Sequence, residues 1–283
     1  MNGTLTRIAL TLGAAVMLSA VSTGQVQTGG RLAFDVASVR ENTSGGDQGF
    51  LLPKGNQLNA QNYRLRSVIQ FAYRVQPFEL VGGPDWIDAA RFDISARAPF
   101  DPKPAPAGAP PGEMEQMAQT LLAERFKLQV HRETREMPIY ALVLARRDGQ
   151  LGPRLRREAE VCAAVRNAAA RRENAPEIPA RADGRPTCGM MGGGGRFFAG
   201  GVTLAMLASA LSPQVARVVV DRTGLSGFFE ADIEFATDAL TNAAAERPSL
   251  FTALEEQLGL RLEPARGPVE VLVIDRVERP TEN

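Results

Sequence analysis

The sequence has few of the side chains that usually carry catalysis or bind metals. Its 283 residues include one histidine, His131, and two cysteines, Cys162 and Cys188. Metal-ligand clusters of the zinc type are absent, because they need several histidines or cysteines at short spacing. No Ser, Cys or acidic partner stands in a triad-like pattern with His131. We therefore expect no metal, no cofactor and no catalytic residue, and interpret His131 as a surface residue.

The sequence also lacks a charge imbalance and long apolar runs. Its 32 basic residues equal its 32 acidic residues, so electrostatics does not favour nucleic acid or an anionic membrane as a partner. The run "GGGG" at 192–195 lacks the lysine and the helix that a phosphate-binding loop needs. After the N-terminal region, no segment is apolar enough to span a bilayer.

Residues 1–24 have the layout of a secretory signal peptide. One cation, Arg7, precedes an apolar run over 8–21 and small residues that suit cleavage near Gly24. The run is shorter than the ~20 residues of a spanning helix. No cysteine follows it, so lipoprotein processing is not expected. We expect a mature chain that is periplasmic or secreted, with an uncleaved membrane anchor as the alternative.

Export favours a disulfide between Cys162 and Cys188, because extracytoplasmic compartments are oxidising. Both cysteines lie in a long polar segment. A bridge closing such a loop is expected to contribute roughly 3–4 kcal/mol to stability. A two-cysteine metal site and a reactive thiol are the alternatives, and neither has further residues to support it.

Two parts of the sequence match each other in the same order. Three segments of the first half correspond to three of the second, and the spacing changes only at predicted loops. The matched segments are 55–73 with 194–212, 120–128 with 252–260, and 138–146 with 268–276. This pattern indicates an internal duplication.

Each copy predicts an α+β module of order β-α-β-β-α-β-β, with its helices packed on one face of a small mixed sheet. Asn62 and Thr203 stand where the N-caps of the first helices belong. The second helices are expected over 113–125 and 249–258, and two separate strands close each copy. A further strand at 33–41 is expected to join the sheet of the first copy. Apolar residues recur at helical spacing in both first helices, at Leu65, Val68, Ile69 and Ala72, and at Leu204, Leu207, Ala208 and Leu211.

These boundaries predict a first module over 33–147, a linker over 148–193 and a second module over 194–283. The linker is rich in Arg, Ala and Gly and contains both cysteines. Its "RLRR" at 154–157 suits contact with an acidic partner, but a solvated linker explains the composition as well.

One turn resembles a catalytic motif. In "VVVDRTGLSGFF", Asp221 ends an apolar strand and Gly224 and Gly227 follow. Aspartic proteases need Asp directly before Thr-Gly, and here Arg222 intervenes. The first copy has Gly82 at the matching corner, followed by Gly83 and Pro84. A corner that accepts Gly or Asp needs backbone geometry, so we predict a structural turn.

Two aromatic residues near the corresponding turn of the first copy are candidates for recognition. Trp86 follows "GGPD", and Tyr73 ends the preceding helix. They predict either an exposed recognition patch or packing over the sheet edge.

Long phrases of the chain resemble a known family. "VVDRTGLSGFFEADIEF", "GGPDWIDAARFDISARAP" and "LLAERFKLQVHRETREMPIYALVLAR" resemble a family of uncharacterised soil-associated bacterial proteins, a domain of unknown function. Some of its members look like extracytoplasmic parts of sensor-type membrane metallopeptidases, which implies sensing or binding. Each half also resembles the short N-terminal domain of secretins and TonB-dependent receptors, through "VVVDRTGLSG" and "ALEEQLGLRL". That likeness implies protein binding without catalysis.

Together these features predict an exported, non-enzymatic protein of the bacterial cell envelope. Its expected partner is an envelope protein, a peptide or a small ligand, recognised without a cofactor. The alternative is a hydrolase of envelope or extracellular polymers that uses carboxylates. Its first candidate residues are Asp221, Asp93 and Asp232, and two carboxyls roughly 5–10 Å apart in one cleft would favour it.

Overall fold

The computed structural model describes residues 31–103, 105, 109–158, 162–165, 167, 187–237 and 247–280. The signal peptide predicted over 1–24 lies outside these residues. All elements named below belong to one compact unit that starts at Leu32. In the described part of the chain, no helix has both the length and the apolar character needed to cross a membrane.

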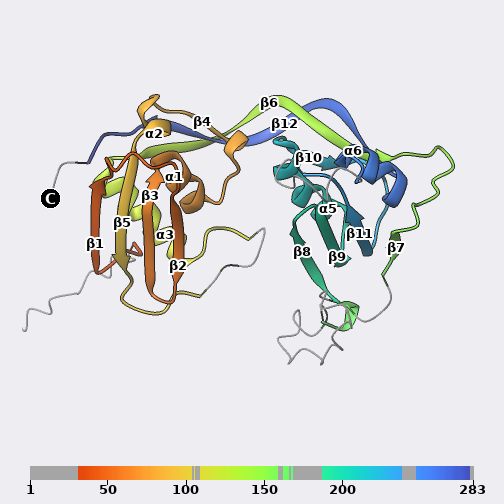
Figure 1. The fold of residues 1–283 in the computed structure, drawn as a ribbon, viewed down its shortest axis with the longest axis horizontal. Coiled ribbons are helices and arrows are strands. Elements are labelled where there is room, and N and C mark those ends of the chain that lie inside the picture. Colours follow the sequence, from red (N-terminus) through yellow and green to blue (C-terminus); the bar gives the residue numbers. More distant parts are fainter. Residues whose placement is uncertain are drawn as a thin grey trace, which may run out of the picture. The chain divides into compact units, whose positions relative to one another are not determined.

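An antiparallel sheet, here called the N-terminal sheet, has the strand order β1-β5-β3-β2. One face packs against two helices in a single apolar cluster, which includes the edge-to-face ring pair Phe92 and Phe126. The expected strand at 33–41 joins this sheet as β1. The elements are β1 (Val36–Glu41), β2 (Phe50–Lys54), β3 (Gln57–Arg64), α1 (Leu65–Tyr73), β5 (Arg91–Arg97) and α3 (Glu113–Arg125) (Figure 1).

Helix α1 forms where the apolar spacing predicts it, since its four predicted core residues are all buried. The predicted N-cap is wrong, because the capping position is Arg64. Asn62 instead lies within β3 with a left-handed φ of 50°. Its side-chain amide donates to the backbone oxygens of Gly46 and Gln48, each at 2.7 Å. Asn tolerates this backbone region better than most residues, which explains the irregularity in β3 at this position. Its two side-chain hydrogen bonds hold the loop that contains Gly46 and Gln48 against the strand.

A second antiparallel sheet, the C-terminal sheet, has the order β7-β11-β9-β8. Here the predicted cap is confirmed, because the Thr203 hydroxyl accepts from the Met206 N–H at 3.2 Å. The predicted helix over 249–258 is an α-helical turn that continues as a π-helix. The elements are β7 (Leu155–Arg157), β8 (Gly189–Gly193), β9 (Arg196–Val202), α5 (Leu204–Leu211), η2 (Ser212–Val215), β11 (Phe229–Glu234), α6 (Leu250–Ala253) and η3 (Leu254–Leu258).

Strands β7 and β8 come from the segment that the sequence predicts to be a linker, 148–193. Where this segment is described, it therefore contributes both edges of the C-terminal sheet. The predicted disulfide is confirmed: Cys162 bonds Cys188, with their Cα atoms 5.6 Å apart. Because Cys188 directly precedes β8, the bridge fixes the start of that strand.

The central sheet joins the two halves of the chain. Its order is β10-β6-β12-β4, with β10 (Val219–Asp221), β6 (Gln129–Leu144), β12 (Leu260–Arg276) and β4 (Leu80–Gly82). The two long strands pair antiparallel along almost their whole length, and Figure 1 shows them side by side. Each short strand pairs in parallel with the long strand of the other half.

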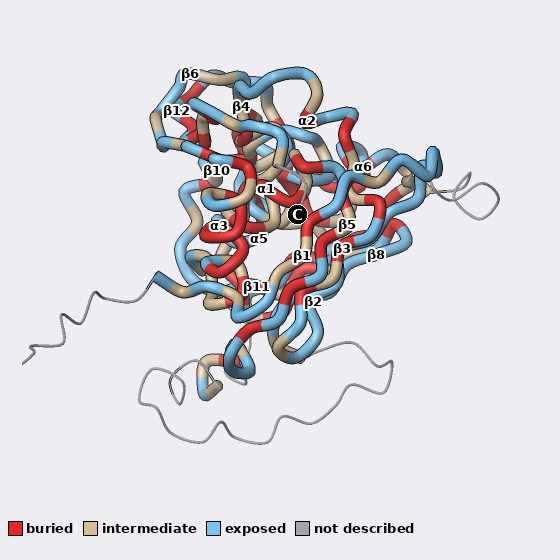
Figure 2. Tube along the Cα trace, turned by 90° about the vertical axis from the view of Figure 1, so that its left-hand side faces the viewer, coloured by how far each residue is buried: buried red, intermediate tan, exposed pale blue. Residues whose placement is uncertain are grey.

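Each half was expected to close with two strands, and this expectation is wrong. β6 and β12 are each one continuous strand of 16 and 17 residues. The backbone groups of β6 pair with those of β12 along both of the strands that were predicted in each half. No turn therefore interrupts either long strand. The connection from β4 to β5 contains the short helix α2 (Trp86–Ala89), and the 3₁₀ turn η1 (Pro77–Glu79) precedes β4. Figure 2 shows the buried residues concentrated in the strands and helices.

Candidate functional site

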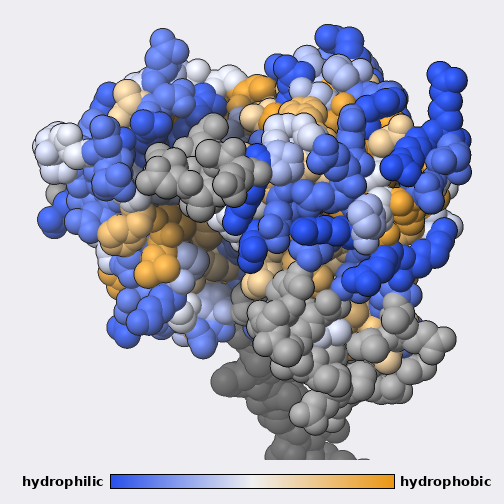
Figure 3. Space-filling model, turned by 45° about the vertical axis from the view of Figure 1, so that its right-hand side comes forward, coloured by the Kyte–Doolittle hydropathy of each residue, from blue (hydrophilic) through white to orange (hydrophobic). Residues whose placement is uncertain are grey.

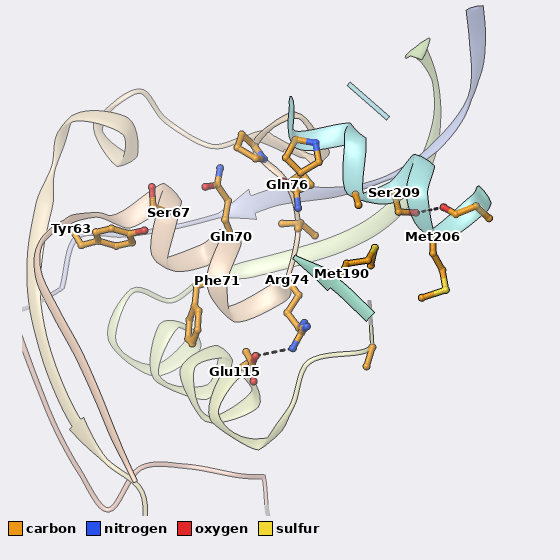
Figure 4. Close-up of a pocket in the computed structure, with 16 residues that line it drawn as sticks. Tyr63, Ser67, Gln70, Phe71, Arg74, Gln76, Glu115, Met190, Met206 and Ser209 are labelled. Atoms are coloured by element: carbon orange, nitrogen blue, oxygen red, sulfur yellow. Dashed lines mark hydrogen bonds and ion pairs between the residues drawn. The ribbon is translucent and has the colours of Figure 1, made fainter. Parts of the chain in front are cut away.

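A cleft of about 1100 Å³ lies between α1 and α5. Side chains of α1, with Glu115 of α3, form one wall. Side chains of α5, with Pro213 of η2 and Met190 of β8, form the other (Figure 4). The cleft therefore lies between one helix from each half of the chain, and each helix presents the face that its own sheet does not cover.

The α1 wall contains most of the polar groups of the cleft and one ion pair. Ser67, Gln70 and Arg74 line it together with apolar side chains such as Phe71. Arg74 ends the helix with a left-handed φ of 53°, and its Nη1 lies 3.1 Å from Oε1 of Glu115, with 24% and 13% of the two side chains exposed. The same nitrogen donates to the backbone oxygen of Ala105 at 3.4 Å. Because the two opposite charges lie together, the pair adds little net charge to the cleft, and its exposed atoms still offer hydrogen-bond donors and acceptors.

The α5 wall is small and apolar. Ala205, Ala210 and Pro213 leave space, and Met206 and Met190 stand 45% and 37% exposed. Flexible, polarisable methionine side chains adapt to ligands of different shapes. On the face drawn in Figure 3, hydrophobic residues form separate patches within a mostly hydrophilic surface. A cleft with polar groups concentrated on one wall and apolar surface on both walls suits an amphipathic ligand.

Matched positions of the two helices line the cleft with different chemistry. By the sequence match, Gln70 corresponds to Ser209, and Phe71 corresponds to Ala210. All four residues line the cleft. The two walls therefore carry different side chains at positions that the sequence match aligns.

The three carboxylates of the hydrolase alternative lie on three different sheets. Asp93, on β5, accepts hydrogen bonds at 2.8 Å from the Asn42 side chain and the Asn62 N–H. Asp221 ends β10 in the central sheet, and Asp232 lies on β11 in the C-terminal sheet. None of the three lines the cleft. The structure brings no pair of them into one cavity among those lined by described residues.

The turn after β10 has the geometry of a side-chain-capped corner. Oδ1 of Asp221 accepts from the Thr223 N–H at 2.9 Å and from its hydroxyl at 2.8 Å. The following glycines, Gly224 and Gly227, have φ of 71° and 103°. This is an Asx turn, in which a short acidic side chain replaces a backbone acceptor.

The matching turn after β4 uses glycine for close packing. Gly82 and Gly83 have φ of 78° and 82°. A Cβ on Gly83 would lie 2.7 Å from Cδ1 of Ile87 and 3.1 Å from Cδ1 of Ile274. The Pro84 oxygen accepts from the Ile87 N–H at 3.2 Å and begins α2. The backbone conformation disfavours any L side chain at Gly83, and a Cβ there would also have to displace the ends of the Ile87 and Ile274 side chains.

The two candidate recognition aromatics, Tyr73 and Trp86, are both half-buried and pack against the core of the N-terminal sheet. The guanidinium carbon of Arg279 lies 5.0 Å from the centre of the Trp86 ring, in cation–π geometry. Neither aromatic lines the cleft.

His131 is exposed on β6 and has acidic neighbours that the sequence did not reveal. Its Nδ1 lies 2.8 Å from Asp275 of β12, and its Nε2 lies 3.6 Å from Glu133. The hydrogen bond with Asp275 raises the pKa of His131 above its usual value. The ion pair with Arg135 lowers the pKa of Glu133. Within the described residues, no group of three His, Cys, Asp or Glu side chains is arranged to hold a metal.

Sequence reasoning missed the cleft residues Arg74, Glu115, Met190 and Met206. Arg74 and Glu115 are far apart in sequence, and only the packing of α1 on α3 makes them neighbours. The sequence contained one weak signal for the cleft. The apolar spacing of the helix over 204–211 accounts for its core residues, and Met206 is an additional apolar residue on the opposite, exposed face.

Comparison with known proteins identifies a family. The family model described as "Protein of unknown function (DUF3738)" matches residues 66–277, which include the cleft helices α3 and α5 and all of α1 except Leu65. No curated protein and no solved structure gives a significant match. Because the match covers most of the chain, the protein belongs to the DUF3738 family.

Proposed function

We propose that the protein is a non-enzymatic binding protein of the bacterial cell envelope, and that the cleft between α1 and α5 is its ligand site. The observation that carries the proposal is the cleft itself. It has room for a small molecule or a short peptide segment, polar groups concentrated on the α1 wall, and a mostly apolar wall with two exposed methionines.

Two arguments favour binding over hydrolysis. Carboxylate-based hydrolysis needs two carboxyls in one cleft, and the three candidates occupy three separate sheets. Asp232 does share a cavity with Glu234, but Glu234 is ion-paired with Arg196 at 3.2 Å. Asp221 makes two hydrogen bonds that hold a turn, which is a sufficient role for that residue. We therefore assign Asp221, with the glycines of both turns, to the scaffold.

We also propose that the two halves arose by duplication, as modules similar to the short domains of secretins and TonB-dependent receptors. The strand orders β1-β5-β3-β2 and β7-β11-β9-β8 support this origin, because β3 and β5, which match β9 and β11 in sequence, take the same central places in their sheets. In a duplicated scaffold, the surface between corresponding elements is free to acquire binding chemistry without disturbing either core. The N-terminal sequence supports export, since it has the layout of a signal peptide.

Methionine-methyl NMR tests the binding proposal directly. Met190 and Met206 line the cleft, whereas Met117 is fully buried in the core and serves as an internal control. We expect mixtures of short peptides, cell-wall fragments and amphipathic small molecules to contain a component that shifts the Met190 and Met206 signals and leaves Met117 unchanged.

Matched variants make the test specific. Ser209→Trp fills the cleft from an exposed position on α5 and should abolish the shifts, whereas Ala89→Trp adds the same bulk on exposed α2, outside the cleft. If no mixture perturbs either cleft methionine in the folded protein, the binding proposal is wrong.

A further inference from the structure

We propose that the outer edge of β8 accepts an extended peptide as an additional strand of the C-terminal sheet. This inference rests on the proposed function, because Met190 of β8 also lines the cleft. It names the partner class: a polypeptide segment in β conformation with apolar side chains at alternating positions.

The backbone of β8 is available for such pairing. β8 is the last strand in the order β7-β11-β9-β8, and all five of its residues are exposed. Its inner edge pairs with β9 from Gly189 to Gly193. Every second residue of an antiparallel edge strand turns its N–H and C=O away from its neighbour. Among the described residues, none hydrogen-bonds to this outer edge.

The other outer edges of the two antiparallel sheets carry features that discourage pairing, and β8 does not. β1 contains Arg40 and Glu41, β2 contains Pro53 and Lys54, and β7 contains Arg156 and Arg157. Proline and charged side chains are the usual means by which proteins protect an exposed edge. β8 reads Gly-Met-Met-Gly-Gly, with no charge and no proline. An exposed strand without such protection suits partner addition.

Both faces of β8 open into cavities that would receive the side chains of an added strand. Successive residues of a strand point to opposite faces. Met190 lines the cleft between α1 and α5. Met191, 48% exposed, lines a second cavity of about 780 Å³ whose other residues include Phe198 and four charged side chains, Arg154, Arg196, Asp232 and Glu234. Each face of the strand therefore offers a methionine to an apolar side chain of the peptide, and the second cavity also offers charged partners.

The strand is held in place before any partner arrives. The Cys162–Cys188 disulfide fixes the residue before it. Gly194 and Gly195, with φ of 56° and 74°, form the tight turn into β9 after it. Both positive angles suit the two-residue hairpin turn that keeps strands in register. A preformed edge reduces the ordering cost of binding.

Selection from a phage-displayed library of short random linear peptides tests the inference on the purified chain. The selected peptides are then synthesised, and their affinity is measured by isothermal titration calorimetry. We expect Met190→Lys to weaken binding by about tenfold or more. The matched control is Leu52→Lys on edge strand β2, where Leu52 is also exposed, and it should leave binding unchanged.

Backbone N-methylation of a selected peptide distinguishes strand pairing from side-chain contact. An added strand uses only one of its edges, so methylation at every second residue should abolish binding, and methylation at the residues between should not. Equal sensitivity along the peptide would refute strand addition.

The remaining outcomes separate this inference from the proposed function. Peptides that lose affinity with Ser209→Trp but tolerate N-methylation at every position bind the cleft without pairing to the edge, so the inference fails and the binding function stands. A dimer seen by light scattering, and lost with Met190→Lys, would assign the edge to a second copy of this chain instead. A library without binders overturns the inference, while the NMR test with non-peptide ligands decides the cleft independently.

Discussion

The turn at Asp221 offers a direct test of scaffold against catalysis. Asp221→Ala removes the acceptor of two hydrogen bonds, from the N–H and the hydroxyl of Thr223. The turn directly follows the place where β10 joins the other half of the chain, since the Arg222 N–H donates to the Leu142 oxygen at 2.9 Å. Loss of the turn is therefore expected to weaken an attachment of the second half to the central sheet.

The magnitude follows from the two bonds. An intramolecular hydrogen bond contributes about 1 kcal/mol net, and water replaces part of this because Asp221 is only half-buried. We expect Asp221→Ala to lower the free energy of unfolding by about 1–2 kcal/mol, which for a chain of this size lowers Tm by roughly 2–8 °C. Asp221→Asn keeps an Oδ1 acceptor and should cost less than about 0.5 kcal/mol.

Urea unfolding followed by far-ultraviolet circular dichroism measures both variants, with equal m-values showing that the same surface is exposed. Ligand binding in the cleft should survive in both, since Asp221 lies outside it. A stable Asp221→Ala protein would refute the turn argument. So would an Asn variant that keeps its stability but loses a biological activity, because that pattern indicates chemistry at the carboxylate.

Three further predictions concern stability. Replacing both cysteines by serine removes a bridge that spans 26 positions of sequence and should lower the free energy of unfolding by about 3.5 kcal/mol on chain-entropy grounds; a loss near zero in urea titrations would contradict this. Gly83→Ala places a side chain on a left-handed backbone and brings its Cβ too close to Ile87, so it should lower the free energy of unfolding by about 2 kcal/mol or more. Gly149 also has a left-handed φ, 72°, but has open space around it, so Gly149→Ala should lower the free energy of unfolding by about 1 kcal/mol through the backbone conformation alone. The raised pKa of His131 means that its ion pair with Asp275 stabilises the fold fully below pH 6.5 and is lost as pH rises through the higher folded-state pKa. The urea midpoint should therefore fall over that range in the wild type and change less in Asp275→Asn, and an NMR titration of the single histidine checks the direction of the shift.

Local patterns predicted local structure well. The apolar spacing of α1 and α5, the Thr203 cap and the bounds of α3 depend on neighbours within a few residues, so the sequence contains the necessary information. The disulfide followed from composition and the expected compartment. The prediction that Asn62 caps the first helix was wrong because the strand continues through Asn62, which has a left-handed φ, and Arg64 takes the capping position.

Long-range pairing was beyond the sequence argument. Nothing local distinguishes two short strands from one long strand when both have alternating polarity. What made β6 continuous is its antiparallel partner β12, more than a hundred residues away in the chain. The same pairing placed Asp275 beside His131 and gave an apparently isolated histidine its carboxylate neighbour.

By itself, the sequence determined the α+β class, most of the helices, the bridge between the two cysteines and the glycine-dependent turns, because spacing, caps and backbone preferences act over a few residues. Only the tertiary structure decided that the halves share a central sheet, that the three suspect carboxylates lie apart, and that α1 and α5 form the walls of a cleft beside the open edge of β8. These features depend on which distant surfaces pack together, and that choice is made by the burial and hydrogen bonding of the whole chain.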